Sequence, residues 1–126
     1  MVVGHYGCGG VQAVLKDAKF GLIDNWLRHV GDVKEKYTSK INALAEKDRL
    51  NSLIELNVIE QVRNVCRTNI VQEAWQRGQE LTIHGWVYGL ANGHLHDLES
   101  VVTCADEVDV NYKSAGLKVF ERYVVE

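Results

Sequence analysis

A glycine-rich turn near the start of the chain constrains its fold more than any other feature. Residues 4–10 read Gly-His-Tyr-Gly-Cys-Gly-Gly; apolar residues 1–3 precede them, and a short stretch with helical spacing, 11–16, follows. Glycine permits the backbone conformations of a tight turn, and a strand, a turn and a helix in succession make up the unit of α/β proteins. The sequence therefore predicts an α/β fold whose first strand ends at this turn.

Apolar residues at helical spacing predict most of the remaining chain. They indicate an amphipathic helix over 22–33 and a longer helix over 50–65. Leu56 lies off the main apolar stripe of the longer helix, so we expect that helix to be buried on more than one side. A short helix is expected from Thr68 or Asn69 to a left-handed Gly78, and a last helix over 106–123.

The clearest strand is the nearly continuous apolar run over 81–90, which is typical of a strand covered on both faces. His84 within it is expected to be a packed core residue. Asn92-Gly93 predicts a type I′ turn that folds residues 94–98 back as an antiparallel neighbour. Two strands and a short stub make a small sheet for so many apolar helix faces, so the chain is expected to be part of a larger fold.

Composition excludes several classes of function. The chain has 126 residues, enough for a single domain, and a formal net charge of -3 without a basic patch, which argues against nucleic-acid binding. No apolar run approaches the ~18 residues of a membrane helix, and no signal peptide precedes the turn. Three cysteines, an odd number, argue against a disulfide framework and indicate a reducing compartment, so we expect a cytoplasmic protein.

His5 and Cys8 carry the chemistry that the turn suggests. An imidazole and a thiolate three residues apart, on a turn that leaves a strand, can both face one cation. Zinc is a borderline-soft ion that accepts mixed nitrogen and sulfur ligands. A His-x-x-Cys pair alone is a weak signal, but in its glycine-rich context it predicts a metal site with His5 and Cys8 as ligands.

Several segments resemble the β-class carbonic anhydrases. The first is the turn with its flanking valines, residues 2–11, which is similar to that family's second zinc-ligand motif. The resemblance continues, in family order and spacing, through Gly-Leu-Ile-Asp-Asn-Trp-Leu (21–27), Glu-Leu-Asn-Val-Ile-Glu-Gln-Val (55–62), Ala-Trp-Gln-Arg-Gly-Gln (74–79) and Thr-Ile-His-Gly-Trp-Val-Tyr-Gly (82–89). It is strongest over 2–99, and we interpret 1–126 as one partial β-carbonic-anhydrase domain.

The resemblance implies a fold and a reaction. The fold would be an α/β domain with a mainly parallel sheet, helices around it and an antiparallel edge strand from His94 onward. The reaction would be the reversible hydration of carbon dioxide to bicarbonate. Family zinc is held by one His and two Cys, of which His5 and Cys8 match two, and family domains pair as dimers that often assemble further, so a homo-oligomer is expected.

One part of the family pattern is absent. The family's Cys-x-Asp-x-Arg motif, which supplies the other cysteine ligand, occurs nowhere in the 126 residues. Met1 stands where the family has an aliphatic strand residue, which suggests a start within a longer ancestral reading frame. Two ligands hold zinc weakly, so we expect the isolated chain to be inactive or feebly active. Cys66 and Cys104 are better interpreted as ordinary packed residues than as replacement ligands.

Two other functions compete with the enzyme. The chain could be a non-catalytic descendant, an interaction module that oligomerises through its exposed half-sheet. It could also be a thiol redox protein that uses Cys8, but no resolving cysteine lies nearby in the sequence. Zinc content and carbon dioxide hydration separate the enzyme from the module.

Overall fold

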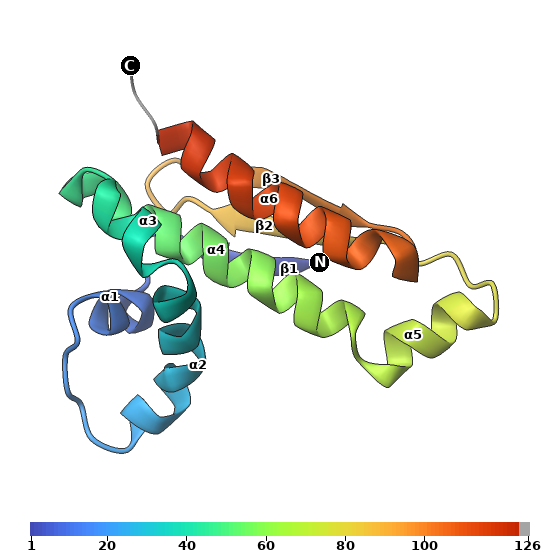
Figure 1. Cartoon of the computed structure of the whole chain (residues 1–126), viewed down its shortest axis with the longest axis horizontal. Coiled ribbons are helices and arrows are strands. Elements are labelled where there is room, and N and C mark those ends of the chain that lie inside the picture. The colour runs from blue at the N-terminus through green and yellow to red at the C-terminus, as the bar shows by residue number, and fades with distance from the viewer. Residues whose placement is uncertain (124–126) are drawn as a thin grey trace.

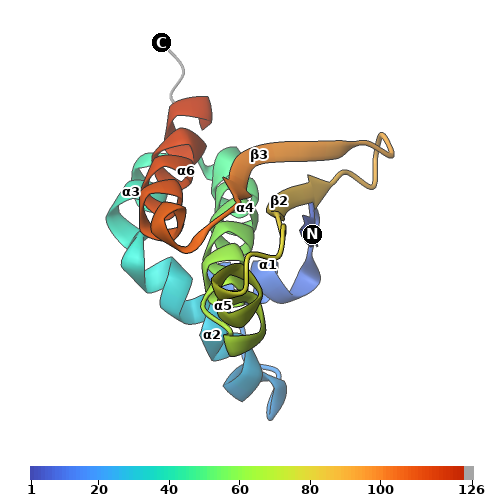
Figure 2. The same ribbon diagram turned by 90° about the vertical axis from the view of Figure 1, so that its right-hand side faces the viewer.

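The computed structural model describes residues 1–123 and arranges them as a small sheet with helices packed on one side of it (Figures 1 and 2). In chain order the elements are β1 (Val2–His5), α1 (Gly9–Leu15), α2 (Ile23–Lys36), α3 (Thr38–Ala43), α4 (Glu46–Cys66), α5 (Asn69–Gln76), β2 (Ile83–Tyr88), β3 (Leu95–Val102), the 3₁₀ turn η1 (Ala105–Glu107) and α6 (Val108–Tyr123). Figure 1 shows α4 across the middle of the molecule, with α6 beside it and the strands behind.

The three strands form one sheet in the order β1-β2-β3. β1 runs parallel to β2, with Gly4 opposite Val87, and β3 runs antiparallel to β2 as the other edge. The α/β class and the antiparallel edge strand are therefore confirmed. Within residues 1–123 the sheet is mixed, with one parallel and one antiparallel pair, rather than mainly parallel.

The long helix α4 covers the inner face of the sheet at close range. A β-carbon built on Gly4 would lie 2.7 Å from Val58 Cγ2, and one built on Gly85 would lie 2.9 Å from Val62 Cγ2. Both distances are shorter than carbon atoms tolerate, so glycine at these two strand positions lets the helix pack against the backbone. Leu56 is fully buried on another side of α4, as its position off the main stripe predicted.

The outer face of the sheet carries no helix among residues 1–123 (Figure 2). Side chains of β2 alternate: Val87 is buried on the inner face, whereas Tyr88 is exposed on the outer face. Residues 1–123 therefore cover one face of the strand, and cover for the other face is not supplied by the described residues. His84 likewise lies half-buried on the outer face, tilted against Trp86 with ring centroids 5.4 Å apart, and is not a core residue.

The connection between β2 and β3 differs from the predicted turn. A type I′ turn needs positive φ at both central residues, but here only Gly93 has one (φ 70°) and Asn92 does not. The Gly89 N–H instead donates to the His94 carbonyl oxygen (2.9 Å), which closes a longer loop. The Asn92 side chain accepts from the His94 N–H (3.0 Å), so this residue supports the loop through its amide rather than its backbone.

The predicted ends of α5 are confirmed. The Thr68 hydroxyl accepts a long hydrogen bond from the Val71 N–H (3.5 Å) at the start of the helix. Gly78 follows the last turn with φ 77°, the left-handed conformation that ends many helices. The helices predicted over 22–33 and 50–65 are present but longer, since α2 continues to Lys36 and α4 begins at Glu46.

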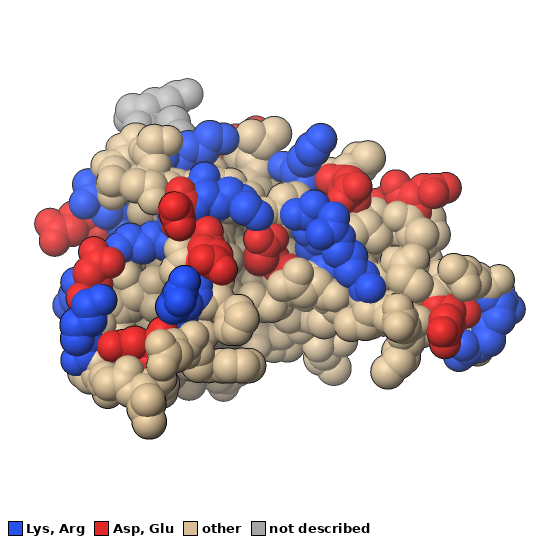
Figure 3. Space-filling model, turned by 60° about the horizontal axis from the view of Figure 1, so that its bottom comes forward, with Lys and Arg blue, Asp and Glu red and all other residues tan. Residues whose placement is uncertain are grey.

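Charged side chains of both signs are intermixed on the face shown in Figure 3. Some are paired, as in the Lys36–Glu60 contact (2.6 Å) and the longer Arg63–Asp109 contact (3.7 Å). Exposed pairs of this kind contribute about 0–1 kcal/mol each, so they do not determine the fold.

Over the described part of the chain, no helix combines the length and apolar character that crossing a bilayer requires.

Candidate metal centre

The glycine-rich turn begins where β1 leaves the sheet. His5 is the last residue of β1 and lies opposite Tyr88 of β2. The Tyr6 N–H donates to the Tyr88 carbonyl oxygen (3.0 Å), which extends the pairing by one residue. Gly7 then reverses the chain with φ 75°, a conformation that disfavours residues with a side chain. The turn is thus anchored to the sheet on its strand side and free to bend at its glycine.

His5 presents one ring nitrogen to the protein and leaves the other available. Its Nδ1 lies 3.0 Å from the Tyr6 carbonyl oxygen. A carbonyl oxygen only accepts hydrogen bonds, so this contact favours the neutral tautomer with the proton on Nδ1, which leaves Nε2 as the acceptor. Histidines that bind metals commonly donate their second ring N–H to a backbone carbonyl in this way. The ring itself is exposed, on the outer face of the sheet.

Cys8 stands at the N-cap of α1, and its carbonyl oxygen accepts from the Gln12 N–H (3.0 Å). Its thiol is free and partly exposed. A β-carbon at Gly10 would lie 3.9 Å from the Cys8 sulfur and 3.3 Å from Leu27 Cδ2 of α2. The contact with Leu27 is tight and the one with the sulfur is an ordinary van der Waals distance, so glycine at this position lets α2 approach the turn.

These two donors suit zinc but do not complete a site. Neutral imidazole nitrogen and thiolate sulfur are its usual ligands, and protein sites supply three or four of them. Among residues 1–123 no group of three His, Cys, Asp or Glu side chains could hold a metal ion. Cys66 is buried at the end of α4, and Cys104 follows β3, so neither joins His5 and Cys8 in a metal-binding group.

Beneath the turn lies a carboxylate that the sequence analysis did not single out. Glu55 is 1% exposed, in the middle of α4, and its Oε1 accepts a hydrogen bond from the Tyr6 hydroxyl (2.9 Å). Burial, and then the Glu55 charge, raise the pKa of Tyr6 well above its usual value. The signal in the sequence was an acidic residue within the apolar run Leu53-Ile54-Glu55-Leu56. A charge at such a position calls for polar partners.

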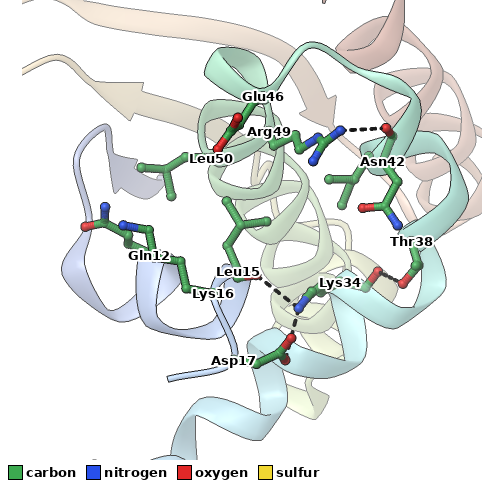
Figure 4. A pocket seen from close by; sticks show the side chains of 11 residues that line it. Gln12, Leu15, Lys16, Asp17, Lys34, Thr38, Asn42, Glu46, Arg49 and Leu50 are labelled. Atoms are coloured by element: carbon green, nitrogen blue, oxygen red, sulfur yellow. Dashed lines mark hydrogen bonds and ion pairs between the residues drawn. The ribbon is translucent and has the colours of Figure 1, made fainter. Parts of the chain in front are cut away.

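A hollow of about 540 Å³ lies among α1 to α4, and neither His5 nor Cys8 lines it (Figure 4). Lys34 points into it, but its Nζ already donates to the Val14 and Leu15 carbonyl oxygens (3.1 and 3.2 Å) and contacts Asp17 (3.1 Å). These contacts satisfy carbonyl groups at the C-terminal end of α1. The lysine therefore has a local structural role.

Comparisons with known proteins converge on one family. A family model described as carbonic anhydrase matches residues 1–95. The chain is 41% identical, over 78% of its own length and 43% of the relative's, to a carbonic anhydrase of Emericella nidulans. It is 30% identical, over 79% of its own length and 46% of the relative's, to a carbonic anhydrase of Pseudomonas aeruginosa.

Solved structures similar to this chain belong to the same family. The chain is similar to a Coccomyxa β-carbonic anhydrase in complex with acetazolamide, with a TM-score of 0.78 and 33% identity over 98% of this chain and 58% of that one. It is also similar to one of two tetrameric β-carbonic anhydrases from Sordaria macrospora, with a TM-score of 0.71 and 27% identity over 80% of this chain and 52% of that one. The chain spans less than half the length of the two curated relatives above. It belongs to the β-class carbonic anhydrase family.

Proposed function

We propose that this protein catalyses the reversible hydration of carbon dioxide to bicarbonate, with zinc held by His5 and Cys8. Family membership supports the reaction. The observation that carries the choice of ligands is the state of His5, whose Nδ1 is tied to the Tyr6 carbonyl oxygen (3.0 Å) so that Nε2 is free for a metal. Three residues later, Cys8 offers a free thiol.

Each residue of the turn has a defined part in this proposal. When bound, zinc lowers the pKa of a water molecule, so that hydroxide is available to attack carbon dioxide near neutral pH. His5 supplies a neutral nitrogen ligand, and the Tyr6 carbonyl oxygen fixes its tautomer. Cys8 supplies a thiolate, whose charge offsets part of that of the cation. Gly7 lets the chain reverse between the two ligands.

We expect the isolated chain to bind zinc less tightly than a complete site does. Residues 1–123 bring no third His, Cys, Asp or Glu into a metal-binding group with these two. Because proteins hold zinc with three or four side chains, full activity requires a further ligand from outside the described residues. Feeble turnover by the purified chain is therefore the expected result.

Zinc content and carbon dioxide hydration, measured on the same preparations, test the proposal. His5→Ala and Cys8→Ser should each remove the zinc that the wild-type chain retains and abolish its turnover. His84→Ala and Cys104→Ser are matched controls, since they delete the same side-chain types at the end of the sheet opposite to His5 and Tyr88. Zinc binding that survives both turn variants but falls in the controls would place the metal elsewhere.

A second candidate is a non-catalytic module that oligomerises through its exposed half-sheet. The outer face of the sheet supports it, because Val3 and Tyr88 are exposed there beside Trp86. The carbonic anhydrases of Sordaria macrospora named above are described as tetrameric, which supports a homo-oligomer for either candidate. Light scattering of the wild-type chain and of Val3→Lys tests self-association. A defined oligomer lost in Val3→Lys, without zinc or turnover in the wild type, favours the module.

The proposal also places the protein in the cytoplasm. All three cysteines are free in the structure, which is the state that a reducing compartment maintains. Fractionation of cells that express the protein tests this placement, and recovery from an oxidising compartment would contradict it.

A further inference from the structure

Glu55 is the point at which several separate elements meet beneath the turn. It lies on α4, buried, with Oε1 accepting from the Tyr6 hydroxyl (2.9 Å). Arg122 of α6 approaches the same oxygen (Nη2 at 3.7 Å), and so does His96 of β3 (Nε2 at 3.9 Å). Of these three groups the Tyr6 hydroxyl makes the shortest contact, at ordinary hydrogen-bond length. Tyr123 of α6 faces the same carboxylate, since burial and then Glu55 raise its pKa.

A buried carboxylate of this kind is costly. Removing a charge from water costs several kcal/mol unless its partners offset the loss, and apolar residues of similar size often serve stability equally well. The second oxygen, Oε2, has no hydrogen-bond partner among the described residues. Packing alone therefore does not account for a glutamate here. Its partners do, and of Tyr6, Arg122 and His96 the tyrosine makes the shortest contact.

Tyr6 connects this carboxylate to the ligands on either side of it in the sequence. Its side chain points down to Glu55, while its carbonyl oxygen accepts from His5 Nδ1 (3.0 Å) and its N–H donates to Tyr88 (3.0 Å). Tyr6 therefore binds Glu55 through its hydroxyl and His5 through its carbonyl oxygen. The residue is thus held at both its side chain and its backbone.

We propose that Glu55 is a positioning residue for the metal ligands: by holding the Tyr6 hydroxyl, it keeps the Tyr6 carbonyl oxygen where it orients His5. The metal-binding part of this inference rests on the proposed function. The orientation of His5 does not, because it is a property of the metal-free chain.

Three variants separate positioning from general stability. Tyr6→Phe removes only the hydroxyl, and Glu55→Gln keeps an oxygen that can accept from it. Tyr112→Phe is the control, because it removes a tyrosine hydroxyl of α6 that contacts Lys36 (2.7 Å) and not the turn. Circular dichroism first establishes that each variant is folded; Glu55→Ala is avoided because it leaves Arg122 without its partner.

The first readout is the His5 tautomer, followed by the ¹⁵N chemical shifts of its ring in the metal-free protein. The Nδ1–H form should dominate in the wild type, Glu55→Gln and Tyr112→Phe, and the two tautomers should mix in Tyr6→Phe. The second readout is zinc affinity. It should fall about tenfold in Tyr6→Phe, which is the lower end of the loss seen when a residue that orients a metal ligand is replaced. It should stay near the wild-type value in Glu55→Gln and Tyr112→Phe.

A wild-type tautomer in Tyr6→Phe would overturn the positioning role, whatever its zinc affinity. So would a mixed tautomer that also appears in Tyr112→Phe, since the effect would then be general. A wild-type chain that binds no zinc would instead contradict the proposed function, and the tautomer comparison would still decide whether the Tyr6–Glu55 hydrogen bond orients His5.

Discussion

The two faces of the sheet are built from the same three strands and differ in almost everything else. On the inner face Val87 is 0% exposed and α4 packs within contact of Gly4 and Gly85. On the outer face Val3 is 46% exposed and Tyr88 37%. The difference is visible in Figure 2, where the helices lie to one side of the strands.

This difference separates stability from chemistry. Buried apolar area is the main favourable term in folding, and it lies on the inner face. The candidate ligand His5 belongs to the outer face and is exposed. Tyr6 and Cys8 of the turn pack against the buried core, and the Tyr6 hydroxyl is hydrogen-bonded to Glu55. Substitutions on the inner face should therefore change the free energy of unfolding, and those on the outer face should leave it nearly unchanged.

Leu53→Ala should show the largest effect. Leu53 of α4 is 0% exposed, and truncating a buried leucine costs about 2–5 kcal/mol through lost burial and the cavity left behind. Leu117→Ala on α6 is the matched control, because that leucine is 54% exposed and should change stability by less than about 0.5 kcal/mol. Urea unfolding measures both. Equal losses would mean that the exposed side of α6 is also buried in solution.

Gly85→Ala tests the closest approach of helix and sheet. Its β-carbon would lie 2.9 Å from Val62 Cγ2 and 3.2 Å from Ser100 Cβ, so the strand or the helix must shift, at a cost of about 1–3 kcal/mol. Gly31→Ala in α2 meets no atom within 4 Å and should stabilise the helix by about 0.5–1 kcal/mol. The free energy of unfolding should therefore fall in Gly85→Ala and rise in Gly31→Ala. A change in the same direction in both variants would contradict the packing described.

Val87→Thr and Val3→Thr place the same change on the two faces. At Val87 the new hydroxyl is buried without a ready partner and should cost about 1–2 kcal/mol. At Val3 it is exposed to solvent, and the change should be close to zero. Thermal unfolding at several protein concentrations measures both. A large loss at Val3 that grows with concentration would show that another copy covers the outer face.

The same comparison explains which parts of the fold could be predicted from the sequence. Helix α4 could be predicted, because its apolar residues recur with the period of a helix and Leu56 marked a second buried side. Which face of β2 is buried could not be predicted. His84, Trp86 and Tyr88 are apolar or amphipathic enough to be buried, and nothing local says whether another element covers them.

The candidate site also has one part that could be predicted from the sequence and one part that could not. His5, Cys8 and the glycine between them are neighbours in the sequence, so local spacing was enough to single them out. Glu55 lies 49 residues beyond Tyr6, and only the tertiary fold brings the two together. The prediction of a type I′ turn at Asn92-Gly93 was wrong for another reason. The Asn92 side chain accepts a hydrogen bond from the His94 N–H, which stabilises a longer loop than the dipeptide alone predicts.

The smallest effect is expected at Glu107, an exposed residue of the 3₁₀ turn η1 that precedes α6. Its carboxylate accepts from the Thr103 N–H (2.8 Å) and hydroxyl (2.9 Å), and these bonds lower its pKa. Because the lowered pKa belongs to the folded state, the stabilisation is present above the ordinary glutamate pKa of about 4.3 and is lost as the pH falls through the folded value. Glu107→Gln should therefore unfold at slightly lower urea concentration than wild type at pH 7, and the two midpoints should converge in acid. A gap at pH 7 as large as that of Leu53→Ala would mean that exposed hydrogen bonds stabilise this fold as strongly as its inner face, and the distinction between the two sides would fail.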